Sequence, residues 1–97
     1  MIVRIVKMTF REETIAGFLD NFEKHKMQIR EFEGCEKLEL LRDTKNPNIF
    51  FTHSYWQSET HLESYRHSDL FKGVWTFTKS LFADKPQAWS LTKEYSA

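Results

Sequence analysis

The chain has 97 residues, of which 40% are hydrophobic, and its 14 basic and 14 acidic side chains cancel to a formal net charge of zero. This length fits a single domain over residues 1–97, the hydrophobic fraction argues against disorder, and the lack of a basic excess argues against a nucleic-acid partner. One cysteine leaves no internal disulfide, and no apolar run approaches the ~18 residues of a membrane span, so we expect a cytoplasmic protein without a membrane partner.

Aromatic residues are unusually frequent, with nine Phe, three Trp and three Tyr. A chain this short buries only about two-thirds of the surface that its unfolded form exposes. The surplus of rings therefore predicts either a second chain that completes the core or a cavity lined with rings.

The first half of the chain predicts a strand, a helix and a second strand. Residues 2–10 alternate with apolar side chains on both faces, which predicts a strand covered on both sides. From Arg11 the apolar spacing changes to three and four residues, which predicts an amphipathic helix that extends to Phe32. Gly34 is placed to stop this helix in a left-handed conformation, and residues 35–43 alternate again.

The second half predicts a hairpin and two helical segments. A polar turn after residue 43 leads to a strand over 49–56 that is rich in aromatic residues. Ser58 is a predicted N-cap for a short helix over 59–67, and Ser68 is the predicted N-cap of the next helix. Pro86 blocks further helix, after which alternation predicts a last strand from Gln87 to Tyr95.

The resulting β-α-β-β-α-β order predicts a ferredoxin-like α+β fold with an antiparallel sheet and both helices on one face. The other face would be bare in a monomer and would include Ile49, Phe51, His53 and Tyr55 or their neighbours. An apolar patch of this size usually marks a protein interface, so we expect a homodimer packed sheet to sheet.

Motifs for cofactors and metals are absent from the sequence. The three glycines are isolated, so no phosphate-binding loop or dinucleotide fingerprint is present. No HxxxH or HxH pair occurs among the four histidines, and we expect neither a cofactor nor a metal ion. Cys35 is expected to be a small buried hydrophobe rather than a nucleophile. His53, beside Tyr55 in the aromatic strand, fits either acid–base work or a polar contact in the dimer interface.

The segment from Trp56 to Phe71 carries a family resemblance. A strand ends in Trp, Ser58 precedes a short helix, and a Ser-x-x-Phe step opens the next helix. Upstream, Glu33-Gly34-Cys35 looks like a Pro-Gly-Cys turn with Glu in place of Pro. With the order of elements, this pattern resembles the antibiotic biosynthesis monooxygenase (ABM) family over essentially the whole chain. The resemblance implies a dimeric α+β barrel. It also implies one of three activities known in the family: cofactor-free oxygenation of quinol-like aromatics, haem degradation or isomerisation of small molecules.

The residues of the haem-degrading branch are replaced in this chain. The Asn, Trp and His of that branch fall, by the pattern of this sequence, at Val6, Tyr65 and Trp75. Because an indole cannot coordinate iron, haem degradation by that route is not expected, although haem bound through another histidine stays an alternative. Many other members have a His where this chain has Tyr65, so that acid–base group is also replaced.

The resemblance therefore implies a cofactor-independent monooxygenase, an oxidoreductase, that acts on a small aromatic, quinol-like molecule. The alternative is a non-catalytic dimer that binds a small molecule or is purely structural, in which Tyr65 and Trp75 only fill the core. The expected catalytic residues are Tyr65, His53 and His67, and the expected substrate pocket consists of Val6, Met8, Trp56, Phe71 and Trp75.

Overall fold

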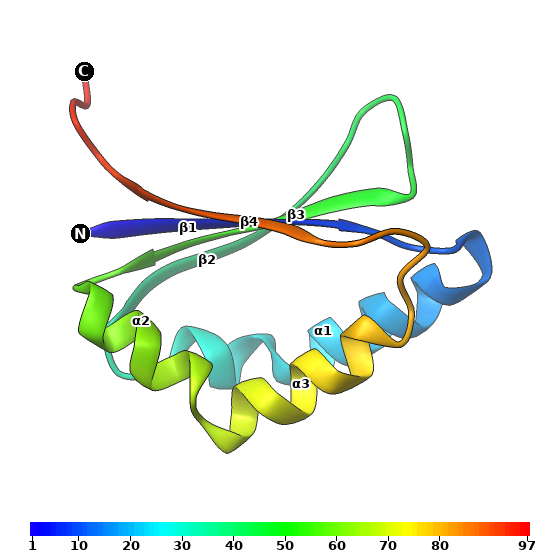
Figure 1. The fold of residues 1–97 in the computed structure, drawn as a ribbon, viewed down its shortest axis with the longest axis horizontal. Helices are drawn as coiled ribbons and strands as arrows, with labels where there is room; N and C mark the ends of the chain where they lie inside the picture. The colour runs from blue at the N-terminus through cyan, green and yellow to red at the C-terminus, as the bar shows by residue number, and fades with distance from the viewer.

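The computed structural model describes residues 1–97 as two layers, a four-stranded antiparallel sheet and a layer of helices on one side of it (Figure 1). The strands lie in the order β2-β3-β1-β4. The predicted βαββαβ order and the ferredoxin-like α+β fold are confirmed, with the second helical stretch divided into two helices. In chain order the elements are β1 (Ile2–Thr9), the 3-10 turn η1 (Glu12–Thr14), α1 (Ile15–Arg30), β2 (Cys35–Arg42), β3 (Ile49–Trp56), α2 (Glu59–Arg66), α3 (Asp69–Lys79) and β4 (Gln87–Thr92).

Two element ends differ from the predicted ones. Helix α1 ends at Arg30 rather than at Phe32, because the chain turns there to enter β2. Strand β4 ends at Thr92 rather than at Tyr95, since Thr92 already pairs with Ile2, the first residue of β1. None of the helices is both long and apolar enough to span a membrane.

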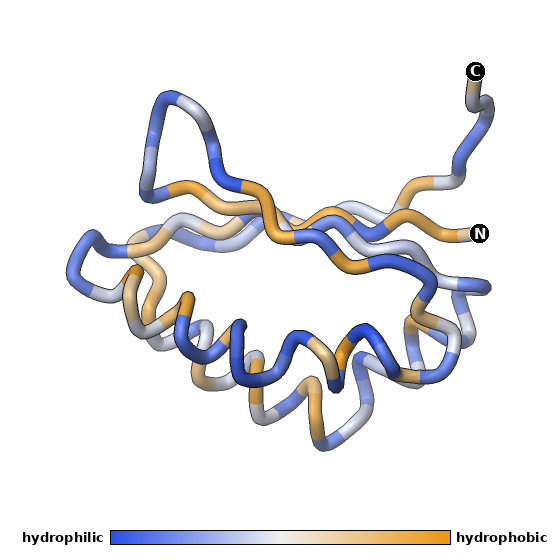
Figure 2. The backbone as a smooth tube through the Cα atoms, turned by 180° about the vertical axis from the view of Figure 1, so that it is seen from behind, coloured by the Kyte–Doolittle hydropathy of each residue, from blue (hydrophilic) through white to orange (hydrophobic).

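The hairpin of β2 and β3 has the predicted polar connection. Figure 2 shows this loop as a hydrophilic extension beyond the sheet, whereas the strands carry hydrophobic stretches. The Asp43 side chain accepts the backbone N–H groups of Lys45 and Asn46 at 3.0 and 2.7 Å, which closes the turn.

Strand alternation divides the sheet into two faces. The covered face lies under the helices and includes Val6, Met8 and Trp56. The open face has no helix against it (Figure 1), so within one chain β1 is covered on one side only, not on both sides as expected. The apolar and aromatic side chains of the open face include Ile5, Leu41, Phe51, His53, Tyr55, Trp89 and Leu91, and the same registers add the charged Lys7, Lys37 and Glu39.

The buried core is divided into two clusters, one joining the end of β1 to α1 and the other joining the end of β3 to α2. Aromatic contacts dominate the first, in which the Phe10 and Phe18 rings stack with centroids 4.2 Å apart. Only 12 of the 97 residues are buried, so neither cluster fills the middle of the sheet–helix interface. The first cluster consists of Met8, Phe10, Phe18 and Phe50, and the second of Cys35, Trp56 and Leu62.

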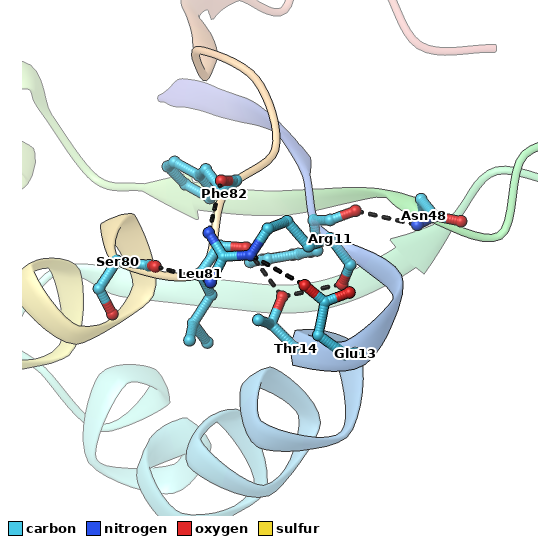
Figure 3. A network of polar contacts seen from close by, with 8 residues as sticks. Arg11, Glu13, Thr14, Asn48, Ser80, Leu81 and Phe82 are labelled. Carbon is cyan, nitrogen blue, oxygen red and sulfur yellow. Dashed lines mark hydrogen bonds and ion pairs between the residues drawn. The ribbon is translucent and has the colours of Figure 1, made fainter.

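Arg11 ties the end of α3 to the end of β1 (Figure 3). Its Nη1 and Nη2 atoms donate to the carbonyl oxygens of Phe82 and Ser80 at 3.2 and 3.3 Å. Thr14 Oγ1 donates to the Leu81 carbonyl at 2.8 Å. These contacts satisfy carbonyl groups that have no partner beyond the last turn of a helix, and they put a cation at the negative end of its dipole.

Gly34 holds the turn between α1 and β2 at the opposite end of the molecule. Its φ of 90° is in the left-handed region, as predicted, and it is the only residue in the chain with a positive φ. A Cβ at this position would overlap the side chain of His61 in α2. The His61 backbone N–H donates to Ser58 Oγ at 3.2 Å, which confirms the predicted N-cap, so α2 is fixed against the turn.

We expect Gly34→Ala to lower the free energy of unfolding by about 2 kcal/mol or more, since it combines an unfavourable φ with a steric overlap. Gly73→Ala is the matched control: a Cβ at this exposed helical position meets nothing within 4 Å, and it should raise the free energy of unfolding by about 0.5–1 kcal/mol. Urea denaturation of both variants measures the two changes. Equal effects of the same sign would contradict this role for Gly34.

Candidate functional site

A cavity of about 290 Å³ lies between the sheet and the helices, in the gap that the two core clusters leave. The sheet forms its floor, and α1, α2 and α3 form its walls. Most of its lining is apolar, with a few polar groups among the apolar ones, which is the usual composition of a small-molecule site. Its aromatic and larger apolar lining residues are Met8, Phe18, Phe22, Ile29, Leu38, Trp56, Leu62, Tyr65, Phe71, Val74 and Trp75.

The cavity exists because the middle of its floor carries small side chains. Val6 of β1 pairs with Thr52 of β3 on one side and with Ala88 of β4 on the other, and all three line the cavity. The large rings of the core lie nearer the strand ends, at Phe10, Phe50 and Trp56. The helices rest on those ends, so the space above the small residues stays empty.

One wall of the cavity is a continuous row of aromatic rings from β3 along α2 and α3. The Trp56 and Tyr65 rings stack with centroids 4.9 Å apart, and the Tyr65 ring meets the Phe71 ring edge-on at 5.2 Å. The Phe71 and Trp75 rings stack at 5.9 Å. This row presents both ring faces and ring edges, which suits contact with a flat aromatic ligand.

Tyr65 is a neutral hydrogen-bond donor at this site. Burial raises the pKa of its hydroxyl well above the ordinary tyrosine value, and the nearby Cys35 adds to the increase. The hydroxyl therefore stays protonated at neutral pH and can donate to a ligand oxygen, but it is not a base. Burial likewise raises the pKa of the Cys35 thiol, and Cys35 is buried as predicted, so an inert thiol is expected.

Several of the polar residues that line the cavity lie on β1 and β3. Trp56 Nε1 donates to Ser54 Oγ at 3.0 Å, and Ser54 is the cross-strand partner of Arg4. Arg4 and Arg66 also line the cavity. The sequence analysis missed Arg4 and Ser54 as site residues. The available signal was their alternation, which places Arg4 on the same face as Val6.

The structure brings Tyr65 together with all five predicted pocket residues around one cavity, but not with the two histidines. His53 lies on the open face, where its Nδ1 is 3.3 Å from Glu39 Oε1. His67 is exposed at the end of α2, with Nδ1 2.8 Å from the Glu63 carbonyl oxygen. Neither lines the cavity, so a catalytic role for either histidine remains a prediction. The pocket residues are Val6, Met8, Trp56, Phe71 and Trp75.

No group of three or more His, Cys, Asp or Glu side chains is arranged to hold a metal ion. The polar side chains that line the cavity are guanidinium, hydroxyl and amide groups, all of which can donate hydrogen bonds and none of which is a carboxylate. The site as built can bind and orient an organic molecule through rings and hydrogen bonds.

The sequence matches the family model described as antibiotic biosynthesis monooxygenase over residues 1–74. A comparison with curated proteins finds no match. Among solved structures, a conserved protein from Methanosarcina mazei Go1 superposes with a TM-score of 0.90 at 20% identity, over 97% of this chain and 94% of that chain. A Mycobacterium tuberculosis protein gives 0.90 at 14% identity, over 99% and 97%. A structure named antibiotic biosynthesis monooxygenase gives 0.90 at 16% identity, over 96% and 98%.

The raised pKa of Tyr65 predicts a pH dependence of stability. Above about pH 10 an unfolded tyrosine loses its proton while folded Tyr65 keeps it, so the free energy of unfolding should fall as pH rises through this range. Tyr65→Phe should reduce the slope of that fall, whereas Tyr95→Phe, at a site that is 85% exposed, should leave it unchanged. Denaturation at a series of alkaline pH values measures the slopes. The same slope in wild type and Tyr65→Phe would show that the hydroxyl is not shielded.

Proposed function

Because the chain belongs to the antibiotic biosynthesis monooxygenase family, we propose that it is a cofactor-independent monooxygenase of a small aromatic, quinol-like substrate. The observation that carries the proposal is the cavity lined by a row of aromatic rings. At about 290 Å³ it is roughly twice the ~150 Å³ that holds one benzene ring, so it fits a molecule of one or two fused rings.

A quinol supplies all the electrons that this reaction needs. Oxygen enters the ring at a C–H position, the ring is oxidised to a hydroxyquinone, and the second oxygen atom leaves as water. The substrate gives up four electrons, two from quinol oxidation and two from the C–H bond, and these reduce O₂ completely. No external reductant is required, so the protein needs to supply only binding, orientation and hydrogen bonds.

The protein contributes binding, orientation and stabilisation of charge. Phe71 and Trp75 hold the ring, and the Tyr65 hydroxyl donates to a substrate oxygen on which negative charge develops. Such a donor in a dry site stabilises an anion more than it would in water. The apolar floor around Val6 and Met8 keeps water from the reacting ring.

A second candidate function is binding of the same class of molecule without turnover. The observation that favours it is the absence of His, Asp and Glu from the lining of the cavity. An oxygenase would then depend on solvent to accept the quinol proton. Measurement of oxygen uptake separates the two functions.

We also propose that two copies of the chain pack through their open faces. Large apolar side chains there are exposed in the single chain: Leu41 is 47% exposed, Trp89 42% and Leu91 46%. Few residues are buried in one chain, and a second sheet would cover these side chains and complete the core. A surface that repeats on both partners suits a two-fold dimer.

Oxygen uptake tests the proposed reaction. With a panel of quinols and anthrones under air, the wild type should consume oxygen above the rate of autoxidation. Tyr65→Phe keeps the ring but loses the donor, and it should lower kcat by about tenfold or more. Tyr95→Phe is the control and should match the wild type. No uptake above autoxidation with any substrate would overturn the oxygenase and leave the binding function.

Trp89→Glu tests the proposed dimer. A carboxylate in the middle of an apolar interface is strongly unfavourable, so this variant should elute and sediment as a monomer where the wild type is a dimer. Phe77→Glu is the matched control, because Phe77 is 44% exposed on α3 and lies away from the open face. A monomeric wild type, or a dimer that both substitutions leave intact, would contradict the proposal.

A further inference from the structure

Both charged residues that line the cavity are basic. Arg4 comes from the covered face of β1 and Arg66 from the end of α2, and no carboxylate lines the cavity. The chain as a whole is neutral, so this arrangement is a local property of the cavity rather than a consequence of a basic surface. A cavity lined by a row of rings, whose only charged side chains are cations, favours an aromatic ligand with a negative charge.

The two arginines differ in their partners. Arg66 Nη1 forms an ion pair with Glu63 Oε1 at 2.9 Å. Arg4 has no ion-pair partner, and its one side-chain hydrogen bond runs from Nη1 to Ser90 Oγ at 2.9 Å. A guanidinium has five N–H donors, so most of those of Arg4 have no protein acceptor.

Half-burial without a carboxylate partner is an unfavourable setting for a guanidinium. Burial lowers the pKa of Arg4 below its ordinary value, and the positive charge of Arg66 lowers it further, while Glu63 acts in the opposite direction. An anion bound beside Arg4 would offset this cost. Arg4 is therefore a partly buried cation with no carboxylate in direct contact with it.

Ser54 adds a second donor next to Arg4. The two residues are cross-strand partners on the covered face, and Ser54 is buried. Its Oγ accepts the indole N–H of Trp56 at 3.0 Å and donates to no protein acceptor, so the hydroxyl proton is free for a ligand. Arg4 and Ser54 both line the cavity, so it offers a charged and a neutral donor, and an oxyanion can accept hydrogen bonds from both kinds.

We infer that the cavity takes an aromatic ligand that carries an oxyanion, with its ring against Phe71 and Trp75 and the oxyanion at Arg4 and Ser54. The inference rests on the proposed use of this cavity as the substrate site. The oxyanion is either a carboxylate attached to the ring or an ionised ring hydroxyl. In the second case Arg4 favours the quinolate form of the substrate, which is the form that gives an electron to O₂.

Three naphthalene probes of nearly equal size test the charge preference: naphthoate, the neutral alcohol naphthalenemethanol, and naphthol. Calorimetric titration at neutral pH should show that naphthoate binds about tenfold or more tightly than the alcohol. If an ionised ring hydroxyl is preferred, bound naphthol should show the absorption of naphtholate at a pH where free naphthol is protonated. Binding of the alcohol as tightly as both other probes, or of none of the three, would overturn the inference.

Substitution at Arg4 identifies the group responsible. Arg4→Met should remove the preference for naphthoate and leave binding of the alcohol unchanged, which also shows that the cavity is intact. Arg4→Lys keeps the charge and should keep part of the preference. Lys72→Met is the matched control, because Lys72 is an exposed cation of α3 that does not line the cavity, and its effect should be under about threefold. Loss of the preference in Arg66→Met but not in Arg4→Met would overturn the assignment to Arg4.

These binding measurements need no turnover, so they separate this inference from the proposed reaction. Oxygen uptake by a protein that binds the charged and neutral probes equally would overturn the inference of an oxyanion-bearing ligand but not the proposed oxygenase. A charge preference that Arg4→Met removes, with no oxygen uptake, would overturn the oxygenase alone.

Discussion

Small side chains in the middle of the covered face are the constraint from which the cavity follows. Val6, Thr52 and Ala88 lie side by side on three neighbouring strands, whereas the large rings lie nearer the ends of those strands. Close packing would normally fill such a space, and an empty volume costs stability in proportion to its size. A chain rich in aromatic residues that leaves a gap at its centre forgoes this stability, which supports the proposed ligand site.

The helices that form the walls of the cavity stay separated from the sheet because the helical layer is attached to the sheet at both ends. At one end Arg11 holds the turn after α3 against the end of β1. At the other end Gly34 allows α2 to approach through His61. Between these two points the aromatic row runs along the cavity from Trp56 on β3 to Trp75 on α3. A substitution that weakens either attachment should therefore change the shape of the cavity, although the residues of neither attachment line it.

The sequence predicted the elements because their signals are local. Alternation identifies the strands, and Ser58 and Ser68 both cap helices as expected. To assign each strand residue to a face of the sheet, the strand register must also be known. The site prediction was incomplete for this reason: His53 alternates onto the open face, whereas the neighbouring Ser54 lines the cavity. Arg4 alternates onto the same face as Val6, but only the position of the helices shows that this face is the covered one.

Strand β3 connects the two proposed surfaces of the molecule. Its residues alternate between the open face, with Phe51 and Tyr55, and the cavity, with Ser54 and Trp56. A second chain against the open face would hold this strand in place from behind, and with it the serine and indole groups that meet the ligand. The position of an oxyanion-binding donor must be fixed to a fraction of an ångström to be effective. The proposed dimer and the proposed ligand site would therefore depend on the same eight residues of backbone.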